Sequence, residues 1–220
     1  MIITIDGPAA SGKSTVAREL AKALGIAFLD TGATYRAVTL KALRQHVNME
    51  DADALARLAG AARIDLLPDA DGTKVLLDGR DVTRGIRSAE VSDSAHYVAR
   101  SPQARRVLVE LQRRTGAALG DFVAEGRDQG SVVFPDADFK FYLDATAEVR
   151  ARRRCTEMLA ARQHADYRQV LEAILLRDGR DINRDVAPLI KPAGAIEIDT
   201  SNLTVEQVTA ELLRHVRGRR

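Results

Sequence analysis

The chain has little cysteine and no long apolar run. One of its 220 residues is a cysteine, Cys155, so an intramolecular disulfide and a zinc cluster built from thiolates are both excluded. The first apolar run, Met1 to Ile5, is far shorter than a signal sequence or a membrane span. From these absences we expect a cytoplasmic protein with no membrane partner.

An excess of one charge is also missing. Lysine and arginine total 33, aspartate and glutamate total 31, and the net charge is +2. Proteins that coat nucleic acid are usually much more basic, and four tyrosines, five phenylalanines and no tryptophan leave few rings to stack on single strands. Apolar residues still make up 45% of the chain, enough for a core. We therefore expect one domain over residues 1–220 and no nucleic-acid partner.

Five short apolar runs alternate with helical patterns. Each run is followed directly by an acidic residue: Asp6, Asp30, Glu125, Asp144 and Asp199. The runs are read as buried strands at 2–5, 26–29, 122–124, 139–143 and 195–198, and the helices at 14–24, 35–46, 52–62 and 206–216. This order predicts an α/β fold with a five-stranded parallel sheet and helices on both faces. Ligands of such sheets bind at the carboxyl ends of the strands, where the five acids fall.

Two further regions complete the expected layout. Short β-like pieces at 64–67, 74–77 and 80–83 are separated by the turn signals "PDADGT" and "DG", so they predict a small antiparallel β insertion. The stretch from "RSAEVS" past Pro102 to about Leu119 reads as helical, and an arginine-rich helical region runs from Ala147 to about Arg184.

A phosphate-binding motif stands between the first strand and the first helix. Residues 7–14 read G-P-A-A-S-G-K-S, which fits G-x-x-x-x-G-K-[ST] in full. Its glycines allow backbone N–H groups to face phosphate oxygens, Lys13 reaches the β- and γ-phosphates, and the Ser14 hydroxyl ligates Mg²⁺. The predicted nucleotide-binding residues are Gly7, Pro8, Ala9, Ala10, Ser11, Gly12, Lys13, Ser14 and Thr15. We expect ATP as the phosphoryl donor.

The motif alone serves switches, motors and kinases alike. A guanine switch normally carries N-K-x-D, and the nearest string here, "INRD" at 182–185, has no lysine and falls on an expected helix. A guanine switch is therefore disfavoured.

Arginines suited to a second anion occur in four stretches: "DTGATYR", "EGRDQG", "RARRR" and "RDGRDINRD". Phosphoryl transfer depends on positioning and charge stabilisation, which converging guanidinium groups supply. Taken singly, most have a simpler interpretation. Arg177 and Asp181, with Arg184 on the same expected helix face, would be a solvated pair, and Tyr35 a half-buried core residue. "EGRDQG" is the hardest to dismiss because it follows a strand at the ligand edge.

Taken together, the motifs resemble the bacterial cytidylate kinase family. The resemblance covers essentially all 220 residues and rests on "DGPAASGKST", "LDTGATYR", "EGRDQGSVVFPDA", "RDGRDINRDVAPL", "IDTSNLT" and the insertion ending in "DGRDVTRGIR". It implies a monomeric P-loop kinase that phosphorylates CMP and dCMP from ATP and Mg²⁺ by direct in-line transfer. It also implies an acceptor-binding insertion at about 60–95 and a lid at about 150–168.

The resemblance also assigns roles to individual residues. Arg36, Arg127 and Arg184 would hold the acceptor phosphate, Arg177 and Asp181 the sugar hydroxyls, and Asp128 and Arg105 the cytosine ring, with Thr31 and Tyr35 lining the pocket. Lys13 and the lid arginines Arg150, Arg153 and Arg154 would meet the transferring phosphoryl group together with Arg127 and Arg184. Glu125 would organise either Mg²⁺-bound water or the arginines.

Two alternatives stay open. His96 stands where family members carry a pocket serine, which leaves the choice between CMP and UMP undecided. A rival kinase would act on UMP, AMP or a non-nucleotide acid. The rival from another class is an NTPase linked to nucleic acid, suggested by the arginine-rich helix and the "RGRR" end; it predicts hydrolysis stimulated by RNA or DNA.

Overall fold

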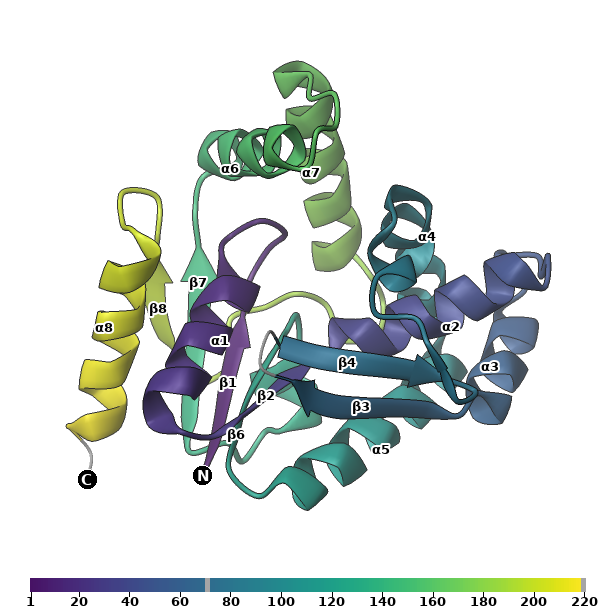
Figure 1. The fold of residues 1–220 in the computed structure, drawn as a ribbon, viewed down its shortest axis with the longest axis horizontal. Coiled ribbons are helices and arrows are strands. Elements are labelled where there is room, and N and C mark those ends of the chain that lie inside the picture. Colours follow the sequence, from purple (N-terminus) through teal and green to yellow (C-terminus); the bar gives the residue numbers. More distant parts are fainter. Residues whose placement is uncertain (70–71, 219–220) are drawn as a thin grey trace.

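A five-stranded parallel sheet forms the centre of the molecule (Figure 1). The computed structural model describes residues 1–69 and 72–218. The strand order is β2-β6-β1-β7-β8, which confirms the predicted sheet. The strands are β1 (Ile2–Asp6), β2 (Ala27–Asp30), β6 (Phe122–Gly126), β7 (Phe139–Asp144) and β8 (Ile196–Asp199).

The acids that follow the apolar runs meet at one edge of this sheet. Asp30 is in register with Glu125, and Asp144 with Asp199. Asp6 lies beside Gly126 on the central strand. The carboxyl ends of parallel strands thus gather these groups as expected, although they come from positions up to 193 residues apart (199 − 6).

Two apolar layers cover the sheet because side chains alternate across each strand. On β6, Phe122 belongs to one layer and Val123 to the other. Helices α1 (Lys13–Leu24) and α8 (Val205–Arg217) pack on the Val123 side. The Phe122 side is covered by α2 (Gly32–Arg44), α3 (Ala52–Ala61), α4 (Ala89–Arg100) and α5 (Pro102–Leu119). Helices therefore cover both faces, as predicted.

The expected antiparallel insertion is present. Its sheet has the order β3-β4-β5, built from β3 (Ile64–Asp69), β4 (Gly72–Leu77) and β5 (Arg80–Asp81), followed by the 3₁₀ turn η1 (Gly85–Arg87). The last strand is shorter than predicted because Asp81 accepts hydrogen bonds from the N–H and hydroxyl of Thr83. Thr73 Oγ1 donates to the Phe28 carbonyl at 3.3 Å, so the insertion is fastened to edge strand β2. Residues 70 and 71 of the predicted "PDADGT" turn lie outside the described residues.

The helix predicted across Pro102 is wrong as one element. It is broken into α4 and α5 at Ser101, which has an extended backbone. Pro102 occupies the first position of α5, where its missing N–H costs nothing, and the Ser101 hydroxyl accepts from Ala104 N. A serine–proline pair therefore starts a new helix here.

The arginine-rich region expected to be helical from 147 to about 184 contains two helices, α6 (Ala147–Ala160) and α7 (Tyr167–Ile182). Asp166 caps the second by accepting from Gln169 N. Arg184 lies beyond α7, so the expected single helix face carrying Arg177, Asp181 and Arg184 is wrong, and "INRD" leaves the helix after Ile182.

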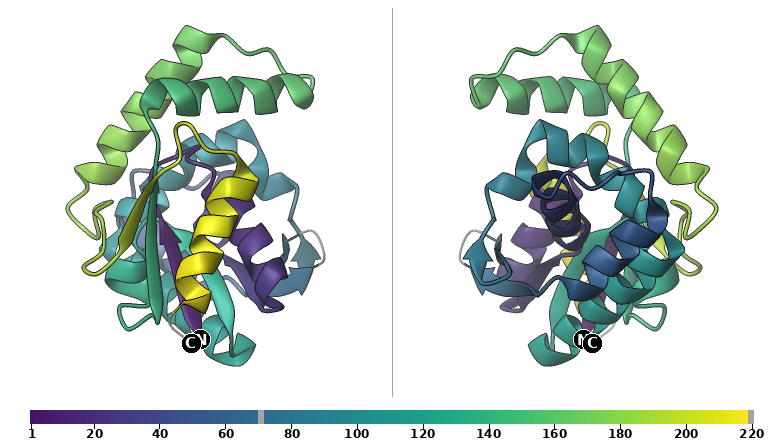
Figure 2. Two further views of the ribbon diagram at one scale, coloured as in Figure 1. Left: turned by 90° about the vertical axis from the view of Figure 1, so that its left-hand side faces the viewer. Right: turned by 90° about the vertical axis from the view of Figure 1, so that its right-hand side faces the viewer.

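Helices α6 and α7 rise over the carboxyl edge of the sheet (Figures 1 and 2). They share a small apolar cluster of Ala151, Val170 and Ile174, separate from the two main layers.

Smaller differences concern boundaries: α2 begins before Tyr35, and β8 ends one residue later than expected. Residues 219 and 220 of the "RGRR" end lie outside the described part. In the part described, none of the helices combines the length and apolar character needed to cross a bilayer.

Two short elements were not predicted: η1, described above, and η2 (Gln129–Val133), a π-helical segment that follows β6. Segment η2 continues the "EGRDQG" stretch and packs against β1 and β6.

Candidate functional site

The loop of residues 7–12 joins β1 to α1 at the carboxyl edge of the sheet (Figure 1). Gly7 has φ +148, and a Cβ there would lie 2.0 Å from the Leu143 carbonyl oxygen. Only glycine allows the loop to leave the strand so close to β7. Gly12, with φ +90, directly precedes α1, whose first residues are Lys13, Ser14 and Thr15. The structure thus forms the strand–loop–helix context that the motif requires.

Lys13 is buried inside this loop. Its Nζ donates to the Pro8 carbonyl at 2.6 Å and lies 3.4 Å from Ser11 Oγ. Burial, helped by the nearby charge of Arg127, lowers the pKa of Lys13 to about 7. A buried cation without a full counter-charge is suited to receive an anion.

Ser14 Oγ donates to Glu125 Oε1 at 2.7 Å and joins the donor loop to the end of β6. A hydroxyl beside a carboxylate fits Mg²⁺, which prefers oxygen ligands and is usually held by one or two protein groups together with phosphates and water. Within residues 1–69 and 72–218, no group of three or more His, Cys, Asp or Glu side chains is arranged to hold a metal by itself.

Asp128 and Arg105 form a buried ion pair in which each side chain is 4% exposed. Arg184 Nη2 lies 4.0 Å from Asp128 Oδ2, and it is buried without a hydrogen-bond partner in the described part of the chain. The Arg105 guanidinium lies 5.5 Å from the centre of the Tyr35 ring. The structure therefore brings together four predicted pocket residues from separate elements.

Arg127 Nε donates to Asp181 Oδ2 at 2.9 Å. The pair expected within α7, Arg177 with Asp181, is thus replaced by a pair between β6 and α7, since Arg127 is the cation that reaches Asp181. Burial raises the pKa of Asp181, but the charge and hydrogen bond of Arg127, together with the charges of Arg177 and Arg184, bring that pKa below its usual value. Burial, with Arg127 adding repulsion, lowers the pKa of Arg177 to about 10.

Arg36 is held by the strand-end acid Asp30, with Arg36 Nη2 lying 2.8 Å from Asp30 Oδ2. Arg87, from the turn after the insertion, lies 3.2 Å from the same oxygen. Sequence reasoning missed Arg87, although it falls in the quoted string "DGRDVTRGIR". Thr31 Oγ1 donates to the Glu125 carbonyl, which ties this corner to β6.

The three arginines predicted for the lid have different surroundings. Arg150 is buried, donates to the carbonyls of Ala145 and Ala9, and pairs with Asp178 at 2.6 Å. Arg153 donates to Thr200 Oγ1 at 3.0 Å, beside the donor loop. Arg154 lies on an exposed surface in a 3.2 Å pair with Glu157. Two of the three thus reach the surroundings of the loop directly.

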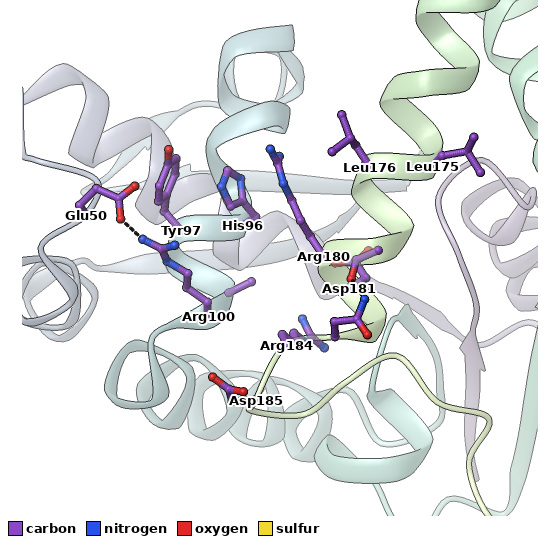
Figure 3. Close-up of a pocket in the computed structure, with 13 residues that line it drawn as sticks. Glu50, His96, Tyr97, Arg100, Leu175, Leu176, Arg180, Asp181, Arg184 and Asp185 are labelled. Carbon is purple, nitrogen blue, oxygen red and sulfur yellow. Dashed lines mark hydrogen bonds and ion pairs between the residues drawn. The ribbon is translucent and has the colours of Figure 1, made fainter.

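A cavity of about 840 Å³ opens between α4 and α7 (Figure 3). Asp181 and Arg184 line one side, and His96 faces them from the other. His96 Nδ1 lies 2.7 Å from the Asp93 carbonyl and therefore carries the hydrogen. Partial burial lowers the pKa of His96, which favours a neutral ring whose Nε2 accepts. Of the predicted acceptor residues, His96, Asp181 and Arg184 thus line this cavity, and the others are not among its lining residues.

Comparison with known proteins identifies the family of the chain. The cytidylate kinase family profile matches residues 3–218. A cytidylate kinase from Pelotomaculum thermopropionicum is 49% identical over 99% of this chain and 97% of its own length. Another from Carboxydothermus hydrogenoformans is 47% identical over 97% and 96%.

A solved structure of an uncharacterized protein from Eubacterium ventriosum has a TM-score of 0.54 at 12% identity, covering 99% of this chain and 98% of that one, which shows a shared fold. The family match and the two relatives go further, because they span nearly the whole chain at high identity. The chain belongs to the cytidylate kinase family.

Proposed function

We propose that this protein transfers the γ-phosphoryl group of ATP to CMP and dCMP, giving ADP with CDP or dCDP. The observation that carries the proposal is the buried Asp128–Arg105 pair. Arg184 lies beside this pair and also lines the cavity between α4 and α7. The family membership supports the same reaction. The complete phosphate loop at the edge of the sheet would hold the triphosphate. The family membership implies that this donor is ATP.

On the donor side, backbone N–H groups of residues 7–15 would surround the β- and γ-phosphates, with Lys13 Nζ turned from the Pro8 carbonyl to the phosphate oxygens. Ser14 and Glu125 would hold Mg²⁺, which supplies charge neutralisation when bound. Arg150 fixes the start of α6 to the Ala9 carbonyl, and this places Arg153 and Arg154 on the helix that faces the loop.

On the acceptor side, the Asp128 carboxylate would accept a hydrogen bond from the exocyclic amine of cytosine. Uracil has a carbonyl there, so it would leave a buried carboxylate facing an acceptor, at a high energetic cost. Arg36, Arg127 and Arg184 would hold the phosphate, and Arg177 and Asp181 the sugar hydroxyls. Thr31, Tyr35 and His96 would complete the pocket.

In the transfer step, an oxygen of the CMP phosphate attacks the γ-phosphorus in line. The new P–O bond forms as the bond to the β–γ bridging oxygen breaks, and ADP leaves with that electron pair. Lys13 and the arginines stabilise the charge spread over the equatorial oxygens. We expect no phosphoenzyme, because the transfer needs no protein nucleophile.

The test is a coupled ADP-release assay with ATP and Mg²⁺ in which CMP, dCMP, UMP, AMP and no acceptor run in parallel. The proposal expects strong turnover with CMP and dCMP and weak turnover with UMP. Equal use of UMP would keep the kinase but remove the proposed selectivity, and ADP release independent of any monophosphate would indicate an NTPase. Addition of RNA or DNA should leave the rates unchanged.

The monomeric state and the cytoplasmic location remain predictions. Light scattering of the purified protein with and without ATP and CMP tests the first. A stable dimer under assay conditions would overturn it.

A further inference from the structure

Asp6 is a buried carboxylate to which the mechanism above gives no role. It is the last residue of the central strand β1 and is fully buried. Its Oδ1 accepts from Gln129 N at 2.8 Å, and its Oδ2 accepts from Gly130 N at 2.7 Å. These two N–H groups are the first of the π-helical segment η2. The donor loop begins at Gly7, so one residue touches both halves of the site.

Asp128 occupies the position where a side chain would normally cap this segment. It directly precedes η2, and its carbonyl accepts from Val132 N and Val133 N. At such a position, aspartate usually accepts from the N–H two or three residues ahead, which here belongs to Gly130 or Ser131. In the described structure, the Asp128 side chain makes no such bond and pairs with Arg105 instead.

Asp6 and Asp128 thus compete for one donor. An Asp128 side chain that capped η2 would accept from the N–H of Gly130, but this N–H already donates to Asp6. Space is tight at this point, since a Cβ on Gly130 would lie 2.8 Å from Thr4 Oγ1 and 3.3 Å from Asp6 Oδ2. Burial raises the pKa of Asp6, and repulsion from Asp128 adds to the rise, so the two carboxylates also disfavour each other at short range.

We propose that Asp6 is a positioning residue for base selection: by taking the N–H groups of Gln129 and Gly130, it keeps Asp128 from capping its own segment and holds the Asp128 carboxylate in the acceptor pocket. The inference rests on the proposed role of Asp128 in reading cytosine. Without the Asp6 carboxylate, Asp128 turns back toward the N–H of Gly130 that Asp6 no longer occupies, and it leaves Arg105.

The test compares Asp6→Asn, Asp128→Asn and the double variant. Asparagine keeps the shape of Asp6 but replaces one acceptor oxygen with an amide group that cannot accept from an N–H. The measured quantity is kcat/KM for CMP divided by kcat/KM for UMP, together with KM for ATP. Asp138→Asn is the matched control, because Asp138 accepts from Ile2 N at the opposite end of the sheet.

We expect Asp6→Asn to lower the CMP/UMP ratio about tenfold or more, the effect of losing one charged hydrogen bond at a buried site. The double variant should be no less selective than Asp128→Asn alone, because both changes remove the same contact. KM for ATP and the Asp138→Asn ratio should stay near wild type. A merely structural role for Asp6 would lower all rates together and leave the ratio unchanged.

A wild-type ratio in Asp6→Asn, where Asp128→Asn loses it, overturns the inference and leaves the proposed function intact. If Asp128→Asn also keeps the ratio, the proposed reading of the base by Asp128 has failed. A crystal structure of Asp6→Asn then tests whether Asp6 positions Asp128. The inference expects the Asp128 carboxylate within ~3 Å of the Gly130 nitrogen; a retained Arg105 pair refutes it. Should Asp6→Asn not fold, Gly130→Ala strains the same contact from the donor side and should lower the ratio alike.

Discussion

The donor and acceptor halves of the site are built in different ways. The donor loop is one continuous stretch of residues 7–15, and its chemistry depends largely on its own backbone and Lys13. The acceptor half takes Arg36 from α2, Arg105 from α5, Asp128 from the turn between β6 and η2, and Arg184 from beyond α7. A local motif can be read from the sequence, whereas a converging set becomes visible only when distant strands end at one edge of a sheet.

The largest expected effect comes from breaking the donor half. Replacing Lys13 by Met removes the cation in the loop, so turnover should fall by ~10²–10³-fold for every acceptor alike, as when other preorganised charge-stabilising groups are removed. The CMP/UMP ratio should not change. The coupled assay measures both, with circular dichroism as the folding control. Turnover within a few-fold of wild type would contradict the assigned mechanism.

Breaking the acceptor half should cost stability as well as activity. In Arg105→Met, Asp128 is left as a buried charge with a weaker partner, so the free energy of unfolding should fall by about 3 kcal/mol. Adding Asp128→Asn should restore part of it, since the stranded charge is removed.

Urea unfolding measures these free energies, and Arg154→Met is the matched control because its pair with Glu157 is exposed. The control should lose less than ~1 kcal/mol. Equal losses for the buried and the exposed arginine would show that the Arg105–Asp128 pair contributes no more to the free energy of unfolding than an exposed pair does.

Asp6, which lies between the donor loop and η2, should make the free energy of unfolding depend on pH. Burial raises the pKa of Asp6 from 3.8 to about 6, although the N–H groups of Gly130 and Gln129 and the charge of Lys13 oppose the rise and Asp128 adds to it. The folded state therefore binds the Asp6 proton more tightly than the unfolded state. Its contribution to stability is full below pH 3.8, falls as the pH rises to about 6, and is flat above that.

Relative to Asp6→Asn, the wild-type protein should therefore lose about 2 to 3 kcal/mol of unfolding free energy as the pH rises from 4 to 7. Urea titrations at several pH values measure this difference. A difference that does not vary with pH, or that favours wild type as the pH rises, would refute the raised pKa of Asp6.

The smallest expected effect lies away from both halves. In Ser101→Ala, the first turn of α5 loses the hydroxyl that accepts from Ala104 N, so the unfolding free energy should fall by about 1 kcal/mol. The kinetic constants should stay near wild type. Thermal unfolding and the CMP assay check both, and a large change in the CMP/UMP ratio would mean that α5 positions Arg105 through its cap.

The predictions that succeeded and failed follow the same division. The parallel sheet, the insertion and the strand–loop–helix arrangement around residues 7–12 were confirmed, because each depends on short-range patterns of apolar, glycine and acidic residues. The single helical stretch across Ser101 was wrong, because Ser101 and Pro102 start a new helix despite continuous helical composition. The helix face shared by Arg177, Asp181 and Arg184 was also wrong, because α7 ends at Ile182. Arg127 as the partner of Asp181 could not be predicted, since 54 residues separate the two.

The sequence by itself determined which functional groups occur along the chain and next to which elements. These are a glycine loop with Lys13, an acid after each buried run, and arginines in a few stretches. These are local properties, set by backbone freedom, side-chain type and spacing. Only the tertiary structure decided which charges meet. Burial makes an unpaired charge costly, so Arg105 takes Asp128, Arg127 takes Asp181, and Asp6 takes the N–H groups of η2 once the parallel strands bring them together.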